Sequence, residues 1–134
     1  MLAKLAAALQ PVLARPDVDV AALFGSAVSG RLRPDSDVDV YVRLARGTRW
    51  TARERRAVAD EAARACGRDV DLVVEDPSTS VILRREVAAT GWLLHESEPG
   101  AWVDVRASAM LAYVDLEPYL RFIGDSIRES VRRG

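Results

Sequence analysis

The stretch over residues 23–42, LFGSAVSGRLRPDSDVDVYV, constrains the chain more than any other part of it. Gly25 and Ser26 follow one apolar run, and ten residues later Asp37 and Asp39 open a second apolar run. Residues i and i+2 of a strand point to the same side, so both carboxylates would project from one face, roughly 6 to 7 Å apart. Carboxylates placed so close repel each other, and a divalent cation or a shared proton usually relieves the repulsion.

The Gly-Ser pair is suited to binding an anion. Gly25 allows a tight turn, and Ser26 begins a short predicted helix whose free N–H groups and dipole favour a phosphate. Arg31 lies just downstream, where it would neutralise a triphosphate. A phosphate-binding turn beside a metal site predicts phosphoryl or nucleotidyl transfer. A P-loop is excluded because Arg31-Leu32 replaces the required Lys-Ser/Thr, and no G-x-G-x-x-G motif occurs.

The triplet Asp-Val-Asp occurs three times, so its position has to decide what each copy does. Asp17 and Asp19 precede the first predicted strand, and at about 3.3 Å per residue they lie roughly 20 Å from Gly25. We therefore expect these two to be solvated turn residues at the far end of the sheet.

The last triplet supplies a third carboxylate for the site. Asp71 is the third residue of a predicted strand, where flanking apolar residues indicate a core position. A helix between two strands is the βαβ pattern, whose strands run parallel, so Asp71 should stand level with Asp39. Asp69 lies on the same face and is the rival for this role. Asp37, Asp39 and Asp71 are the predicted metal ligands and catalytic residues.

Hydrophobic periodicity and turn signals predict a mixed α/β (α+β) fold with about four strands flanked by helices. The link over residues 25–36 is too short for a parallel crossover, so the first two strands should be antiparallel. Thr51 begins a helix with a capping box, and Asp76-Pro77 is predicted to begin the next one. The last strand should lie at an edge. The predicted elements are helix 2–14, strands 18–24 and 37–44, helix 51–66, strand 69–74, a helix that starts at 76 and stops before Gly91, and strand 92–96.

The C-terminal part reads as a helical extension. From Trp102 to Val131 apolar residues recur at steps of three or four, which predicts one long amphipathic helix, or two in line with Pro118 at the break. About 30 residues span near 45 Å, longer than so small a domain is wide, so part of the stripe should cover another chain. We expect one domain over 1–134, with a core to about 98 and the helical segment from about 99.

Charge and composition limit the partners. The chain has 134 residues, 49% of them hydrophobic, and a formal net charge of -1, with the arginines interspersed among acids, so no direct nucleic-acid partner is expected. Cys66 is the single cysteine and fits a reducing cytoplasm, while His95 is the only histidine, so a His-based metal cluster is excluded. The N-terminal stretch reads as an amphipathic helix, and no apolar run approaches the roughly 18 residues of a membrane span. A cytoplasmic protein without a membrane partner is expected.

The Gly25-Ser26 pair, its spacing from Asp37 and Asp39, and the later strand residue Asp71 resemble the DNA polymerase beta-type nucleotidyltransferase superfamily. Within it the chain is most similar to the minimal nucleotidyltransferases, the small antitoxin partners of HEPN-domain toxins, over about residues 18–96. The resemblance implies one or two Mg²⁺ held by the three aspartates. It also implies that Ser26 and nearby backbone N–H groups grip the β and γ phosphates of ATP, and that Asp71 helps to deprotonate the acceptor hydroxyl.

The same resemblance implies a physiological partner. The acceptor would be a tyrosine of a cognate HEPN toxin ribonuclease, silenced by AMP transfer and docked on the C-terminal helical segment, which could equally cover a second copy of this chain. Two alternatives stay open at this point. One is an antitoxin that neutralises by binding alone, and the other is a small-molecule, aminoglycoside-type nucleotidyltransferase completed by a partner subunit.

Overall fold

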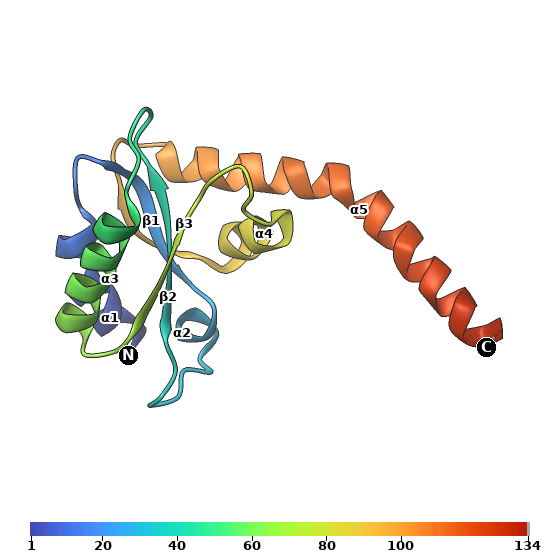
Figure 1. Ribbon diagram of the computed structural model, residues 1–134, viewed down its shortest axis with the longest axis horizontal. Coiled ribbons are helices and arrows are strands. Elements are labelled where there is room, and N and C mark those ends of the chain that lie inside the picture. Colours follow the sequence, from blue (N-terminus) through green and yellow to red (C-terminus); the bar gives the residue numbers. More distant parts are fainter. Residues whose placement is uncertain (134) are drawn as a thin grey trace.

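A four-stranded sheet carries helices on both faces, and one long helix leads away from it (Figure 1). This computed structural model describes residues 1–133, so Gly134, the last residue of the predicted C-terminal segment, lies outside the described residues. The elements in chain order are α1 (Leu2–Leu13), β1 (Val18–Phe24), α2 (Ser26–Ser29), β2 (Val38–Leu44), α3 (Ala52–Cys66), β3 (Val70–Val74), α4 (Val81–Thr90), β4 (Trp92–Glu96) and α5 (Ala101–Arg133).

The strand order is β3-β2-β1-β4, and the lengths of the first two connections fit the directions of the strands they join. β1 pairs antiparallel with β2, across the short link that excluded a parallel crossover. β2 pairs parallel with β3 through α3, and β4 pairs antiparallel with β1 at an edge. The mixed sheet, its strand directions and the edge position of the last strand are therefore confirmed.

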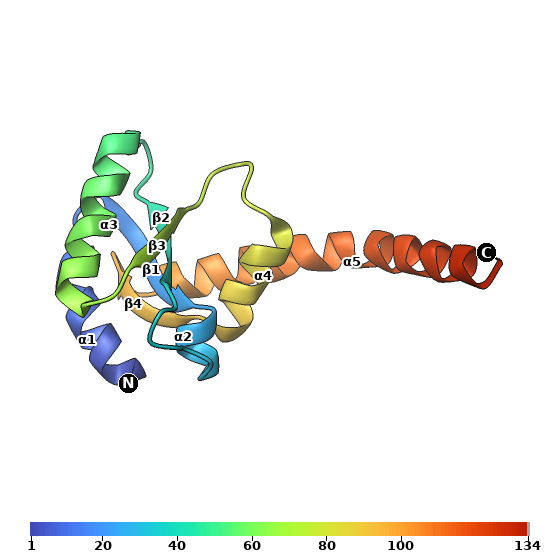
Figure 2. The ribbon, with the colours of Figure 1, turned by 60° about the horizontal axis from the view of Figure 1, so that its bottom comes forward.

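The two faces of the sheet are covered by different helices. Val38, Val40 and Val42 alternate along β2 and pack into the cluster formed with α1 and α3. Tyr41 points the opposite way, into a second cluster that includes residues of α4 and the first turns of α5. Figure 2 shows α1 and α3 on one side of the sheet and α4 and α5 on the other. Because side chains alternate along a strand, Asp39 lies on the α4 face together with Tyr41.

The predicted start of α4 at Asp76-Pro77 is wrong. The Asp76 carboxylate instead accepts hydrogen bonds from the backbone N–H of Ser78 (2.7 Å) and from its hydroxyl (2.5 Å), which closes a local turn. The helix begins four residues later, where the Ser80 hydroxyl accepts from the N–H groups of Ile82 (3.2 Å) and Leu83 (3.4 Å). An Asp followed by Pro is compatible with a turn as well as with a helix N-cap. The sequence pattern alone does not distinguish the two.

We expect Ser80→Ala to lower the free energy of unfolding by about 1 kcal/mol, since it removes the side-chain acceptor of the first α4 amides. Urea denaturation followed by circular dichroism measures this loss. Ser108→Ala is the matched control, because Ser108 is exposed within α5 and caps nothing. Equal stability of the Ser80 variant and the parent protein would show that the cap does not hold the helix start.

The expectation that Asp17 and Asp19 are solvated turn residues is also wrong. Asp19 lies within β1, where its carboxylate forms an ion pair with Arg43 of β2 (2.6 Å) and accepts from the Ser97 hydroxyl (2.6 Å). Asp17 lies in the turn before β1 but accepts a hydrogen bond from Trp50 Nε1 at 2.7 Å. Burial opposes ionisation of Asp19, but the bonds from Ser97 and Arg43 hold its pKa below the usual value. These acids stabilise the end of the sheet that is remote from Gly25.

α5 is one helix with Pro118 inside it, and it changes direction part-way along (Figure 1). Its first turns pack on the sheet through the buried side chains of Ala101, Val105 and Ala109. Beyond them large apolar side chains are exposed, including Phe122 at 69% and Ile127 at 60%. Within residues 1–133, no helix has both the length and the apolar character that crossing a membrane requires.

Candidate functional site

The strand register brings together three segments that are distant in the sequence. Asp39 of β2 lies opposite Asp71 of β3 on one side and opposite Phe24 of β1 on the other. Neighbouring strands lie about 4.8 Å apart, so the Asp39 and Asp71 backbones are adjacent. Gly25 directly follows Phe24, and an added Cβ there would lie 2.3 Å from Asp39 Oδ2. The Asp39 carboxylate therefore rests against the Gly25 turn.

Glycine is required at position 25 for two reasons. Its φ of +72° lies in the left-handed region, and the Asp39 carboxylate occupies the space a side chain would need. Its carbonyl accepts from the N–H groups of Val28 (3.2 Å) and Ser29 (3.1 Å), which starts the short helix α2 at Ser26. No side chain caps this helix start, so its first amides have no side-chain acceptor.

Negative charge accumulates around Asp39. Its side chain is half-buried, and burial together with the charges of Asp71, Asp37 and Glu86 raises the pKa of its carboxyl group. Asp37 precedes β2 by one residue and is exposed, and Asp71 is exposed within β3. Sequence reasoning did not place Glu86 near the site. No local signal could have revealed it, because only the packing of α4 on the sheet brings it near Asp39.

Four of the predicted site residues line two different hollows, and Asp39 and Asp71 are not part of either lining. Gly25, Ser26 and Arg31 line a groove of about 590 Å³ that is bordered on the α4 side by Glu86 and Thr90. The three predicted nucleotide-binding residues thus come together. Arg31 is exposed at the end of α2, and among residues 1–133 its guanidinium has no ion pair.

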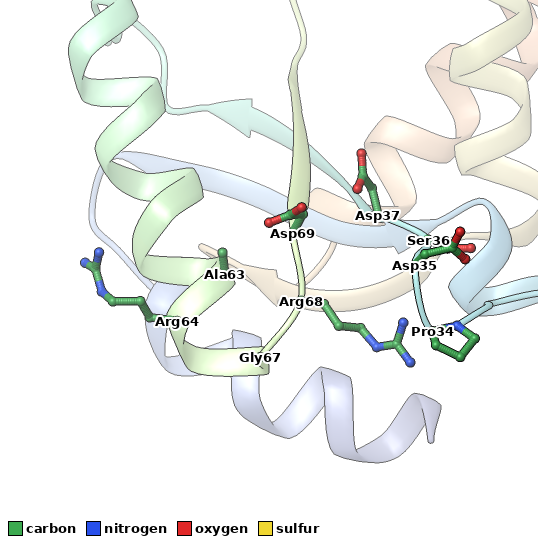
Figure 3. Close-up of a pocket in the computed structure, with 9 residues that line it drawn as sticks. All are labelled: Pro34, Asp35, Ser36, Asp37, Ala63, Arg64, Gly67, Arg68 and Asp69. Carbon is green, nitrogen blue, oxygen red and sulfur yellow. The ribbon is translucent and has the colours of Figure 1, made fainter.

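Asp37 lines the second hollow, of about 430 Å³, together with Asp69 and the last turn of α3. Figure 3 shows both carboxylates at the starts of their strands, above Gly67. The Arg68 side chain points away from them, and its Nη1 donates to the Arg33 carbonyl at 2.7 Å. Asp69, predicted only as a rival to Asp71, therefore accompanies Asp37, while Asp71 accompanies Asp39.

The donor chemistry of this site fits Mg²⁺. Carboxylate oxygens are the hard ligands that Mg²⁺ prefers, and the charge that raises the pKa of Asp39 is what a divalent cation offsets. In the part of the chain that the structure describes, however, no three Asp, Glu, His or Cys side chains stand together as a ready-made ligand set. Metal binding by Asp37, Asp39 and Asp71 therefore stays a prediction.

Comparisons with known proteins agree with this geometry. The family described as Polymerase beta, Nucleotidyltransferase matches residues 8–99. No curated protein matches the chain. A chain of a toxin-antitoxin complex with AMP-PNP is 24% identical, with a TM-score of 0.74 over 92% of this chain and 98% of its own.

A second similar structure is a complex of a tri-AMPylated HEPN toxin from Shewanella oneidensis with an MNT antitoxin. It is 22% identical to this chain, with a TM-score of 0.70 over 96% of this chain and 99% of its own. A third, the toxin-antitoxin MntA-HepT, is 22% identical with a TM-score of 0.70, over 92% of this chain and 97% of its own. At such identities the likeness shows a shared fold. The family match spans most of the sheet and its helices, and the chain therefore belongs to the polymerase beta-type nucleotidyltransferase family.

Proposed function

We propose that this protein is an antitoxin that transfers AMP from ATP to a tyrosine of a cognate HEPN toxin and so inactivates it. One observation carries the proposal: the register places Asp39 opposite Asp71, with the Asp39 carboxylate against the Gly25 turn. Similar chains occur in a complex with AMP-PNP and in a complex with a tri-AMPylated toxin. Both support a nucleotide donor and a protein acceptor.

Different predicted site residues would bind the phosphates of ATP and the metal ions. Ser26 and the first amides of α2 would bind the β and γ phosphates of ATP, with Arg31 adding positive charge. Asp37, Asp39 and Asp71 would hold one or two Mg²⁺, which neutralise charge on the triphosphate and the leaving pyrophosphate when bound. In this arrangement the α phosphorus would lie near the carboxylates at the start of β2 and β3.

Asp71 would act as the general base of the transfer. It would accept the proton of the acceptor tyrosine as the phenolic oxygen forms a bond to the α phosphorus of ATP. The bond from that phosphorus to the bridging oxygen breaks in line, and pyrophosphate leaves. Asp71 is exposed, so a side chain presented by another protein can reach it.

The direct test is to incubate the protein with its toxin partner, Mg²⁺ and ATP labelled at the α phosphate. We expect the label on a toxin tyrosine and a loss of toxin activity that follows the labelling. A toxin that stays unlabelled but is inhibited would instead support neutralisation by binding alone. Labelling of an aminoglycoside without the toxin would support the small-molecule transferase.

The toxin would dock on the second half of α5. Phe122, Ile123 and Ile127 line an apolar groove there, away from the sheet. The similar chains of toxin-antitoxin complexes align with 92% and 96% of this chain, so in a chain of this length the alignment extends into α5. An exposed apolar helix face of this kind is typical of a protein interface.

We expect Phe122→Glu/Ile127→Glu to weaken toxin binding at least about 100-fold, because two charges would be buried in an apolar interface. Isothermal titration calorimetry with the toxin measures the loss. Arg128→Gln/Arg132→Gln is the matched control, since it also makes the net charge more negative by two but lies on the opposite side of α5. If both variants bind like the parent, α5 does not dock the toxin. Sedimentation of the protein alone tells whether the same face covers a second copy.

A further inference from the structure

A further groove, of about 640 Å³, lies where β2 and β3 end. The loop over residues 45–50 and the start of α3 form its walls. In Figure 1 this loop stands at the opposite end of the sheet from α2. Four arginines line the groove, namely Arg43, Arg46, Arg49 and Arg55. The carboxyl ends of parallel strands are a common place for ligands in open α/β sheets. The proposed transfer site does not use this end.

Three of the four arginines are not neutralised by the protein. Arg43 is engaged by Asp19 at 2.6 Å and Asp104 at 3.0 Å. Arg46, Arg49 and Arg55 are exposed, and within residues 1–133 none of them forms an ion pair. The groove thus carries an excess of free positive charge.

Two acids also border the groove, and only Asp76 leaves a carboxylate that offsets one of the free positive charges. Glu75 forms an ion pair with Arg84 of α4 at 3.3 Å. The Asp76 carboxylate accepts from Ser78, and Arg55 acts on it only as a nearby charge that lowers its pKa. The positive charge of Arg46 and Arg49 therefore faces solvent.

The start of α3 adds positive charge where a helix tolerates it least. Five arginines occur between residues 46 and 56, and Arg53, Arg55 and Arg56 fall in the first turns of α3. The positive end of the helix dipole disfavours cations there. Glu54 is the one acid in this segment, and it accepts from the backbone N–H of Thr51 in the capping box. Of these helix arginines, Arg55 lines the groove.

We propose that this groove binds the phosphodiester backbone of a nucleic acid. Guanidinium groups pair with phosphate oxygens through two parallel hydrogen bonds, and several spread along a groove match a chain of phosphates better than one phosphate. Trp50 lines the groove as a fixed wall, because its Nε1 donates to Asp17 at 2.7 Å and Arg15 lies over its ring. The expectation of no nucleic-acid partner rested on the net charge and on arginines interspersed among acids, but residues 46–56 gather five arginines with one acid.

The test uses the full-length protein and a fluorescein-labelled 20-nucleotide single-stranded RNA, followed by anisotropy at several salt concentrations. We expect binding at low salt, and at least a tenfold loss for Arg46→Ala/Arg49→Ala/Arg55→Ala. The slope of log affinity against log salt should become about 2 units shallower, because three phosphate contacts are lost. The corresponding triple Lys variant should keep most of the parent slope.

The matched control is Arg64→Ala/Arg121→Ala/Arg128→Ala, which removes the same charge from exposed positions elsewhere. Equal losses in the two triple Ala variants, or no binding by the parent at low salt, would overturn the proposal. Displacement of the RNA by micromolar AMP would also overturn it, since that result indicates a pocket for one nucleotide. Asp37→Asn/Asp39→Asn should bind the RNA like the parent, which separates this inference from the proposed transfer activity.

Discussion

We expect Asp39→Asn to lower the rate of AMP transfer to the toxin by about 10³-fold or more. Asp39 is the carboxylate that contacts the Gly25 turn and faces Asp71, so its loss removes a charge from the centre of the proposed site. A factor of 10³ corresponds to about 4 kcal/mol of transition-state stabilisation. Transfer of labelled AMP under single-turnover conditions measures it, and Asp60→Asn, an exposed position on α3, is the control.

The same substitution should stabilise the metal-free protein. Burial and the charges of Asp71 and Asp37 raise the folded-state pKa of Asp39, so its ionised form is disfavoured in the fold. The stability that the protonated group contributes is fully present below the unfolded pKa of about 3.9 and is lost as pH rises through the folded value. Asparagine carries no charge at any pH in this range, so the variant does not lose this stability as the pH rises.

Thermal unfolding in the presence of a chelator tests whether Asp39→Asn stabilises the protein. At pH 7.5 we expect Asp39→Asn to unfold a few degrees above the parent, a modest gain because solvent screens a half-buried group. The gain from removing the charge should shrink toward pH 4, where the parent carboxyl group is protonated. Added Mg²⁺ should raise the unfolding temperature of the parent more than that of the variant. A variant that is less stable than the parent at pH 7.5 would show that Asp39 carries no unfavourable charge in the fold.

Local patterns were enough to predict the end of the sheet where the site lies. The short link after Gly25 required an antiparallel neighbour, and the helix between β2 and β3 required a parallel one. Because both aspartates are third in their predicted strands, these constraints set Asp39 beside Asp71, which the register confirms. The roles of Asp37, Asp39 and Asp71 stay predictions, because position alone does not show what a carboxylate binds.

Contacts between distant segments were beyond the reach of the sequence. Asp19 pairs with Arg43, 24 residues away, and nothing in the local Asp-Val-Asp pattern shows it. Glu86 comes near Asp39 only because α4 packs across the sheet. The groove lined by four arginines also depends on tertiary packing, because Arg43 of β2 and Arg55 of α3 line the same hollow. In each case the pairing depends on tertiary packing, which single-sequence periodicity does not encode.

The second large effect is expected for Gly25→Ala. An added Cβ would lie 2.3 Å from Asp39 Oδ2, closer than any real contact, so the carboxylate must move. The φ of +72° adds a backbone cost of about 1–2 kcal/mol. We expect AMP transfer to fall at least about 100-fold, because a displaced catalytic group loses its alignment. Transfer assays and urea denaturation of the same samples measure both effects.

Gly30→Ala separates the clash from the backbone strain. Gly30 has a φ of +79°, close to that of Gly25, but nothing lies within 4 Å of a Cβ added there. The Gly30→Ala variant should therefore lose only the stability that an alanine costs in the left-handed backbone region. Its rate of AMP transfer should stay within about threefold of the parent rate. Similar transfer rates in the two variants would mean that the contact between Gly25 and Asp39 is not needed for the reaction.

A double-mutant cycle measures the coupling between Gly25 and the Asp39 side chain. In an Asp39→Ala background the carboxylate is gone, so Gly25→Ala should cost only as much stability as Gly30→Ala does in the parent. The extra cost seen with Asp39 present is then the coupling between the two positions. If that coupling is zero, the Gly25 turn and the Asp39 carboxylate are independent. A coupling above about 0.5 kcal/mol ties the Gly25 turn to the Asp39 carboxylate, and makes glycine at position 25 a requirement of the proposed site as well as of the turn.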